Sequence, residues 1–183
     1  MTDFLQAHPD GVIAAMDEMS LYVQATTTRV WFPRGQTPIV WVHPQRASLH
    51  YYGALALLSG QEFALTLPAL TSDNTAHFLG HFLSCVPARP ILLLLDRASW
   101  HTGPAIRALL AAEPRLELAF FPPACPDLNP QEHVWKLARD TVSHNHSFTE
   151  SGTLRRAFSH YLDTTVFQFD WLEKYAPATL CHV

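Results

Sequence analysis

The sequence of 183 residues has few cysteines, few charged residues and no long apolar run. Its three cysteines are widely spaced and include no C-x-x-C pair, which gives no sign of a zinc or redox motif, so we expect reduced thiols. No apolar run approaches the roughly 20 residues that a membrane-spanning helix requires, so we expect no membrane partner. The first residues lack the basic region, apolar core and cleavage site of a secretory signal, which predicts a cytoplasmic location.

Positive charge is also scarce, since 12 Lys and Arg stand against 16 Asp and Glu and give a net charge of −4. This balance argues against a complete DNA-binding protein, because much of the affinity for nucleic acid comes from phosphate contacts. Two divalent cations held by acidic residues would add four positive charges and bring the balance to zero. Among eleven histidines, His77 and His81 have helical spacing, but no third ligand or H-E-x-x-H pattern completes a metal site there.

The composition, with 48% hydrophobic residues, is that of a globular protein, and the length fits one domain with a sizeable core. We predict a single domain over residues 1–183, with residues 1–10 as a tail or linker remnant. The expected strands are residues 11–16, 29–33, 38–42, 48–58, 62–67, 91–95 and 116–121, and the expected helices are residues 72–86, 101–112, 130–142 and 151–167.

This order of elements predicts an α/β fold with a mixed sheet and helices on both faces. The first third reads as an antiparallel meander, in which residues 29–33 and 38–42 flank a Gly-containing turn and form a hairpin. The strands after residue 90 alternate with helices, which is typical of right-handed parallel crossovers.

Three acidic residues occupy similar points in this order. Asp17 follows the first apolar run, Asp96 follows the five aliphatic residues 91–95, and Glu132 lies in the first turn of a helix. Mg²⁺ prefers oxygen ligands and uses a few carboxylates while keeping positions for water and phosphate. Three converging carboxylates therefore suit a pair of ions that promote an in-line displacement at phosphorus.

Two of these acidic residues also have a plainer interpretation. Asp17, with its neighbour Glu18, could be an ordinary exposed acid at the end of a strand. Glu132 could complete a capping box with Asn129, since it occupies the third helical position. Asp96 is harder to explain in this way, because an aspartate beside five aliphatic residues needs a charge partner or a ligand.

The segment from Phe121 to Lys136 contains Pro-Asp-Leu-Asn-Pro, then Glu132, then Trp135 three residues on. It resembles the third-acid motif of DDE transposases in the bacterial insertion-sequence branch of the mariner superfamily. Three other segments also resemble this family. Met16-Asp17-Glu18 resembles the first-acid motif, residues 31–38 with their Arg-Gly-Gln resemble the hairpin that follows it, and Leu94-Leu95-Asp96 followed by His101 resembles the second-acid motif. The 35 residues between Asp96 and Glu132 also suit this family, and the resemblance covers residues 12–161.

The resemblance implies a ribonuclease H-like fold and metal-dependent cutting of DNA at transposon ends, followed by joining of the freed 3′ hydroxyl to target DNA. It implies that Asp17, Asp96 and Glu132 are the catalytic and metal-binding residues, with two Mg²⁺ or Mn²⁺ ions. Glu18 is then an outer neighbour of the metal site or a bystander. The family acts in assemblies that hold two DNA ends, which implies a homodimer in the active complex.

Four residues near these acids become candidates for contact with DNA phosphates: Arg97, His101, Lys136 and Arg139. The alternative for Lys136 and Arg139 is charge pairing with Glu132 along the helix, or a plain solvated surface.

The sequence departs from the family pattern in three places. Arg97 replaces the usual Asn, and it could contact a phosphate or neutralise the metal site. Ala124-Cys125 replaces the usual Tyr-Ser, a change that we expect to affect packing. Only 16 residues precede Asp17, so we expect the helix-turn-helix domain that recognises transposon ends to be a separate domain or chain.

Our leading hypothesis is a polynucleotidyl transferase of the transposase type. One alternative is a catalytically inactive transposase remnant that acts as a binding or assembly module, which Arg97 and the short N-terminal segment favour. Another is a nuclease that acts on a different nucleic acid, because three acids and two metals define phosphodiester chemistry better than they define a target.

Overall fold

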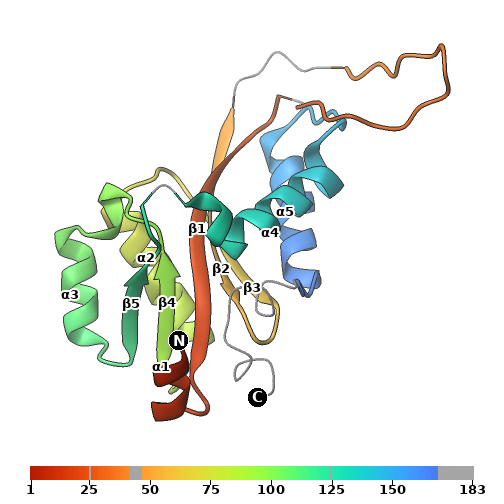
Figure 1. Cartoon of the computed structure of the whole chain (residues 1–183). Coiled ribbons are helices and arrows are strands. Elements are labelled where there is room, and N and C mark those ends of the chain that lie inside the picture. The colour runs from red at the N-terminus through yellow and green to blue at the C-terminus, as the bar shows by residue number, and fades with distance from the viewer. Residues whose placement is uncertain (25, 42–46, 124, 169–183) are drawn as a thin grey trace.

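The computed structural model describes residues 1–24, 26–41, 47–123 and 125–168 (Figure 1). A sheet of five strands lies at its centre, in the order β3-β2-β1-β4-β5. The strands are β1 (Val12–Tyr22), β2 (Ser48–Ala56), β3 (Gln61–Leu67), β4 (Ile91–Leu95) and β5 (Leu116–Phe120). β1, β2 and β3 pair antiparallel, whereas β4 runs parallel to β1 and β5 runs parallel to β4. The predicted mixed sheet, with its antiparallel start and parallel continuation, is confirmed.

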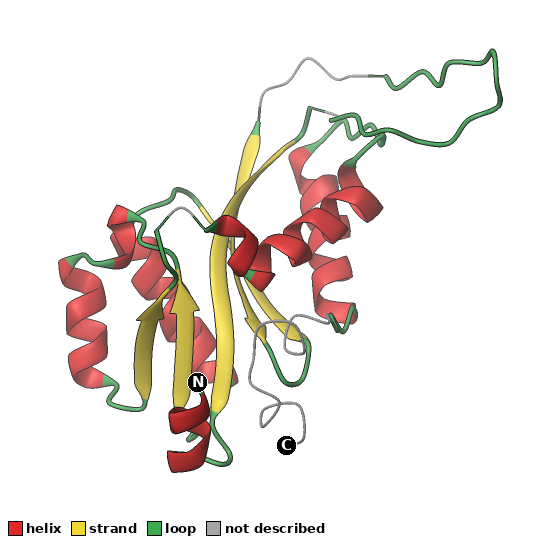
Figure 2. Cartoon of the chain, viewed as in Figure 1, coloured by secondary structure: helices red, strands yellow, loops and turns green. Residues whose placement is uncertain are grey.

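Helices cover both faces of the sheet, as predicted (Figure 2). The α-helices are α1 (Thr2–Ala7), α2 (Ser72–Cys85), α3 (Pro104–Ala112), α4 (Pro130–Ala138) and α5 (Ser151–Thr164). Three shorter helical segments are η1 (Ser99–His101), η2 (Pro126–Leu128) and the π-helical η3 (Arg139–Ser143). None of the helices in the described ranges is long and apolar enough to cross a membrane.

Alternating side chains of the central strands divide the core between the two faces. On one face, Ala14 and Met16 of β1 pack with α2 and α3. On the other face, Met19 and Leu21 of β1 pack with α4 and α5, and Ile13 packs with α1. This alternation follows from the period of two along a strand, and it places neighbouring residues of β1 in different environments.

β1 is longer than predicted, because it continues through Asp17 and Glu18 to Tyr22 instead of ending before them. All of its residues from Ala14 to Tyr22 pair with β2. The alternating apolar residues Met19 and Leu21 supply the buried side chains that keep this second half in the sheet. The prediction that the strand stops at Asp17 was therefore wrong, and Asp17 lies in the middle of a strand.

The N-terminal residues are not the predicted tail. Residues 2–7 form α1, and its Phe4 and Leu5 are buried against Ile13 and Leu92. This short helix covers apolar side chains of β1 and β4 that would otherwise face water, and burial of that surface accounts for its order.

The predicted hairpin over residues 29–33 and 38–42 was also wrong. Residues 26–41 contain no strand and extend away from the body of the protein (Figure 1), while Val42 lies outside the described residues. Gly35 does make a turn, with φ of 86°. Pro33 and Pro38 remove backbone donors on either side of it, and nearly all side chains of residues 29–41 are exposed, so burial gives a strand little support here.

Candidate active site

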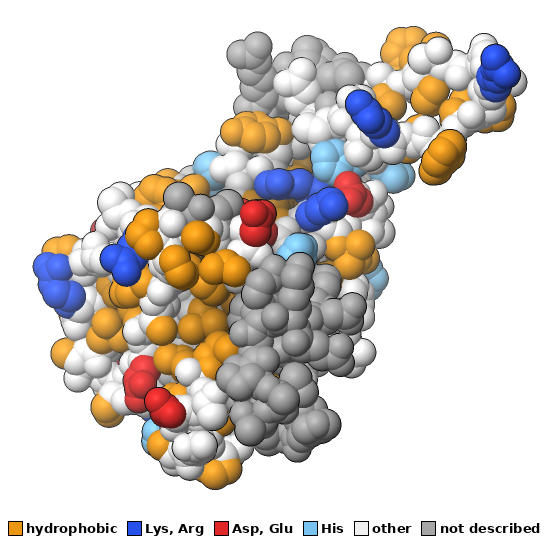
Figure 3. Space-filling view, in the orientation of Figure 1, with side chains coloured by type: hydrophobic (Ala, Val, Ile, Leu, Met, Phe, Trp, Pro, Cys, Tyr) orange, Lys and Arg blue, Asp and Glu red, His pale blue; other side chains and the backbone are white. Residues whose placement is uncertain are grey.

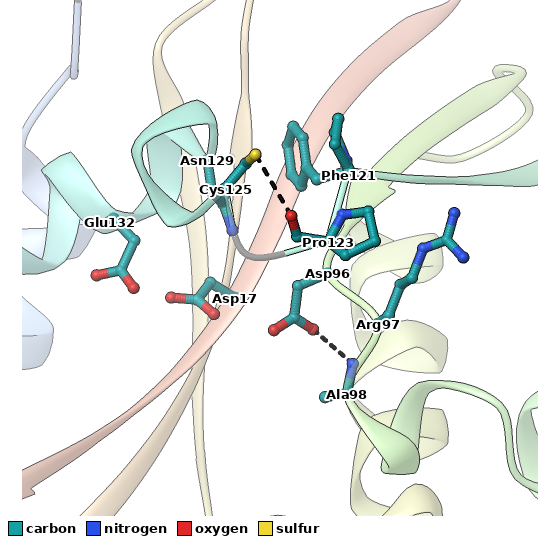
Figure 4. A pocket seen from close by; sticks show the side chains of 10 residues that line it. Asp17, Asp96, Arg97, Ala98, Phe121, Pro123, Cys125, Asn129 and Glu132 are labelled. Atoms are coloured by element: carbon teal, nitrogen blue, oxygen red, sulfur yellow. Dashed lines mark hydrogen bonds between the residues drawn. The ribbon is translucent and has the colours of Figure 1, made fainter.

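Asp17, Asp96 and Glu132, the acidic triad, line one cleft of about 350 Å³. Figure 4 shows their carboxylates in a row along this cleft. The sheet register explains the first two positions, because Ala15 of β1 pairs with Leu94 of β4. Asp17 and Asp96 each lie two residues further along these neighbouring parallel strands, so they reach the same level of the sheet.

The third member of the triad comes from the first turn of α4. The Asn129 side chain caps this helix by accepting a hydrogen bond from the Gln131 backbone N–H at 3.1 Å. The same side chain donates through Nδ2 to the Met16 carbonyl at 3.1 Å, which ties the start of α4 to β1 beside Asp17. Within the described residues the Glu132 carboxylate accepts no hydrogen bond from the Asn129 backbone N–H, so Glu132 lines the cleft without completing a capping box.

Asp17 is less exposed than the other two members of the triad. Burial and, to a smaller extent, the negative charges of Glu132, Glu18 and Asp96 together raise its pKa to about 8. Its Oδ2 accepts a hydrogen bond from Nε1 of Trp135 at 3.1 Å. A carboxylate surrounded by like charges in a cleft is an environment that a cation would stabilise.

Asp96 contacts one backbone donor and one imidazole. Its Oδ1 accepts from the Ala98 backbone N–H at 2.9 Å and lies 2.9 Å from Nδ1 of His101, and this nitrogen also hydrogen-bonds the Asp96 carbonyl oxygen at 3.1 Å. The opposite nitrogen of this imidazole, Nε2, lies 2.9 Å from Glu18 Oε1. Glu18 also accepts from Nε1 of Trp100 at 3.2 Å. His101 therefore lies between the carboxylates of Asp96 and Glu18 and contacts both.

Burial opposes the charge of His101, but hydrogen bonding to Glu18 and the charges of Glu18 and Asp96 outweigh it and raise the pKa of His101. The side chain is only 1% exposed. This placement does not favour the predicted contact of His101 with a DNA phosphate, since a phosphate would have to displace its present partners. Its position instead supports a role in orienting Asp96.

The acidic triad lines the cleft without forming a preassembled ligand set. In the described ranges, no three His, Cys, Asp or Glu side chains stand close enough to hold a metal ion. The three carboxylates still fit a divalent cation chemically, because they offer oxygen donors to one cleft and raise the pKa of Asp17 through their mutual repulsion. Binding requires a closer approach of these side chains, two of which, Asp96 and Glu132, are exposed.

Of the four residues predicted to contact phosphates, only Arg97 lines the cleft. Figure 4 shows its guanidinium directed away from the carboxylates, and no described ion pair joins it to the triad. Lys136 is exposed on α4, and Arg139 lines a separate pocket with Tyr22 and His144. Figure 3 shows Lys and Arg side chains grouped over α4 beside an acidic side chain. The ion pairs found among the described residues do not include one between Lys136 and Glu132.

Sequence reasoning did not find the long-range contacts that support the triad. Trp135, Trp100 and Asn129 each donate a hydrogen bond at the site, and all three contacts join residues more than 80 positions apart. One signal was available for Trp135, because its position three residues after Glu132 places both near one face of α4. The contact of Trp100 with Glu18 depends on the packing of η1 against β1, which local spacing does not reveal.

Proteins with similar sequences and structures help to identify the class to which this chain belongs. An uncharacterized protein of Sinorhizobium fredii, y4pE/y4sA, is 29% identical over 102 residues, which cover 55% of this chain and 73% of that protein. An uncharacterized 39 kDa protein of the insertion element IS630 from Shigella sonnei is 22% identical over 152 residues, which cover 81% of this chain and 43% of that protein.

Among solved structures, the Mos1 transposase paired-end complex with the left transposon end superimposes with a TM-score of 0.68 at 14% identity. The match covers 90% of this chain and 52% of that one. The fold is therefore the ribonuclease H-like fold of transposase catalytic domains. A family model for DDE superfamily endonucleases matches residues 12–155, and the chain belongs to that superfamily. It spans about half of the Mos1 chain and less than half of the IS630 protein.

Proposed function

We propose that this chain is the catalytic part of a transposase that cuts DNA at transposon ends and joins the freed 3′ hydroxyl to target DNA. The observation that carries this proposal is the acidic triad lining one cleft of a ribonuclease H-like fold. Asp17, Asp96 and Glu132 would hold Mg²⁺ or Mn²⁺, and the similar Mos1 paired-end complexes with Mn and with Mg support this choice. We propose two ions, because a pair of ions can stabilise both the attacking and the leaving oxygen at the reacting phosphorus.

The side chains of this protein prepare the cleft for that chemistry. Trp135 holds Asp17 in one orientation, and the Ala98 N–H and His101 hold Asp96. Asn129 fixes the start of the helix that carries Glu132. When bound, divalent cations would activate the attacking water or hydroxyl and stabilise the leaving oxygen.

DNA is the proposed partner, and the similar Mos1 complexes contain transposon ends. The chain matches only part of these longer relatives, so we propose that a separate helix-turn-helix domain or chain recognises the terminal repeats. We also propose that two copies act together in the active complex, which has to hold two DNA ends. The cytoplasmic location stays a prediction.

The decisive experiment measures Mg²⁺-dependent nicking and strand transfer on DNA that carries the element's own terminal repeats. Asp96→Asn should abolish both activities, because it removes a negative ligand while keeping the size of the side chain. Asp163→Asn, at an exposed position on α5, is the matched control and should act like the wild type. Mn²⁺ binding without any action on terminal repeats would favour a nuclease with another substrate. A protein that binds no Mn²⁺ and cuts nothing would be the inactive remnant.

The cationic side chains on α4 give a second prediction. If Lys136 contacts a phosphate, Lys136→Ala should weaken DNA binding about equally for all sequences. It should also reduce the slope of log affinity against log salt concentration by about one. Fluorescence anisotropy at several salt concentrations measures this slope. Arg107→Ala, on α3 at the opposite face of the sheet, is the control, and an equal change in both variants would contradict a specific contact by Lys136.

A further inference from the structure

A buried polar pair, Glu62 of β3 and Gln131 of α4, lies next to the acidic triad. Glu62 is 7% exposed and Gln131 is fully buried. Nε2 of Gln131 donates to Oε1 of Glu62 at 2.8 Å. The other two oxygens, Oε2 of Glu62 and Oε1 of Gln131, have no hydrogen-bond partner among the described residues. Buried polar atoms normally have partners, so this arrangement needs an explanation.

The space for this pair is created by a glycine in the neighbouring strand. Gly53 of β2 pairs with Asp17 of β1 on one side and with Ala64 of β3 on the other. A Cβ at Gly53 would lie 2.4 Å from Glu62 Oε1 and 2.5 Å from Gln131 Nε2, so no other residue fits without movement of the pair. The pair therefore lies against Gly53, the residue of β2 that pairs directly with Asp17.

The protonation state of Glu62 follows from these surroundings. Burial raises the pKa of Glu62 well above its ordinary value, while the one hydrogen bond from Gln131 only partly opposes the rise. An ionised carboxylate with a single neutral partner is costly to bury. A carboxylic acid with its proton on Oε2 can donate to Gln131 Oε1, which would give both oxygens a partner. The acid and the amide then form a ring of two hydrogen bonds.

We propose that Glu62, as a neutral acid paired with Gln131, is a positioning residue that fixes the first turn of α4 and thereby the place of Glu132 in the cleft. Gln131 immediately precedes Glu132, and its backbone N–H is the one that Asn129 caps. The first turn of α4 is thus attached to β1 through Asn129 and to β3 through Gln131. This role rests on the proposed function, since it acts through a residue that would hold the metal.

The test compares substitutions that keep the paired hydrogen bonds with substitutions that remove them. Glu62→Gln keeps two hydrogen bonds as an amide pair, and the exchange E62Q with Q131E keeps an acid and an amide in reversed positions. Glu62→Leu and Gln131→Leu fill similar volumes without polar atoms. We expect the two Leu variants to bind Mn²⁺ about 10- to 100-fold more weakly in calorimetry, the range for lost outer partners of metal ligands. We expect Glu62→Gln and the exchanged pair to bind Mn²⁺ nearly as the wild type does.

A general loss of structure would not reproduce this pattern, because rescue by Glu62→Gln and by the exchange requires the pair itself. Glu117→Gln, an exposed position on β5, is the matched control. Wild-type Mn²⁺ affinity in Glu62→Leu would overturn the positioning role. Equal losses in Glu62→Gln and Glu62→Leu would show that the charge of Glu62 is required, and would overturn the neutral pair.

Two measurements distinguish failure of this inference from failure of the proposed function. Infrared spectroscopy with ¹³C-labelled glutamate should show a protonated glutamic acid at neutral pH, and the band should disappear in Glu62→Gln. Hydrogen exchange in the metal-free protein should be faster over residues 131–134 in Glu62→Leu than in Glu62→Gln. Both can be read in a protein that binds no metal and cuts no DNA. Absence of the band, or equal exchange in the two variants, would overturn the inference whatever the activity.

Discussion

Asp17→Asn is expected to make the metal-free protein more stable while removing its activity. Burial and three neighbouring acids raise the pKa of Asp17 to about 8, so ionisation of this side chain destabilises the fold. Asparagine keeps the size and can still accept from Trp135. A shift from 3.8 to about 8 corresponds to several kcal/mol. After a discount for water in the cleft, we expect a gain of roughly 2–4 kcal/mol in the free energy of unfolding.

The sign of the pH dependence follows from the raised pKa. Below about pH 4, Asp17 is protonated in both the folded and the unfolded state, so the substitution should change stability little. Between about pH 4 and pH 8 the unfolded state loses the proton first, and the gain from Asp17→Asn should grow across this window. Denaturant unfolding at several pH values measures the gain, with Asp163→Asn as the control. A destabilised Asp17→Asn protein at pH 8 would contradict this description of the cleft.

Asp17→Asn should lower the activity although it raises the stability of the metal-free protein. Loss of an outer partner of a metal ligand typically costs 10- to 100-fold in affinity or activity, so loss of a proposed ligand should cost more than about 100-fold. Addition of Mn²⁺ should raise the melting temperature of the wild type and leave that of the variant unchanged. Equal stabilisation of both proteins by Mn²⁺ would show that Asp17 does not contribute to the metal site.

His101→Ala is expected to be the most destabilising substitution near the cleft. His101 is buried between Glu18, whose side chain is 3% exposed, and Asp96. Among the described residues, its removal leaves the carboxylate of Glu18 with Trp100 as its remaining side-chain donor. Breaking a buried ion pair in this way costs about 3–5 kcal/mol. His77→Ala, an exposed position on α2, should stay within about 0.5 kcal/mol of the wild type.

The pH dependence of this effect has its own sign. Because the pKa of His101 is raised in the folded protein, its charged form stabilises the fold fully below the unfolded pKa of about 6.5. That contribution disappears as the pH rises through the folded pKa. The difference between His101→Ala and the wild type should therefore shrink from pH 6 toward alkaline pH. A difference that grows with pH would show that His101 is neutral in the folded protein.

The sequence predicted the acidic triad and the order of the elements around it because both depend on local patterns. Five aliphatic residues before Asp96 mark a buried parallel strand, and Asn129 followed by Pro130 marks the start of a helix. Such signals need only a few neighbouring residues.

The supporting contacts could not be predicted in this way. The ring of His101 reaches Glu18 across 83 positions, and Gln131 reaches Glu62 across 69. These contacts depend on how separate elements pack. The errors over residues 1–10 and 29–41 have the same origin. α1 is ordered by burial of Phe4 against β1 and β4, whereas residues 29–41 match a hairpin pattern but remain almost entirely exposed.

The pairing of Asp17 with Gly53 also limits which insertions the protein can tolerate. A slip of one residue between β1 and β2 would turn every side chain of β1 to the opposite face and would exchange Asp17 with Glu18. If β2 shifted instead, Tyr52 or Ala54 would come to the position where Trp135 and Gln131 leave no room for a Cβ. The close contacts at Gly53 therefore oppose a shift of β2, so a single-residue insertion in β1 has to be accommodated within β1 itself, as a bulge or as a turn of its side chains to the opposite face.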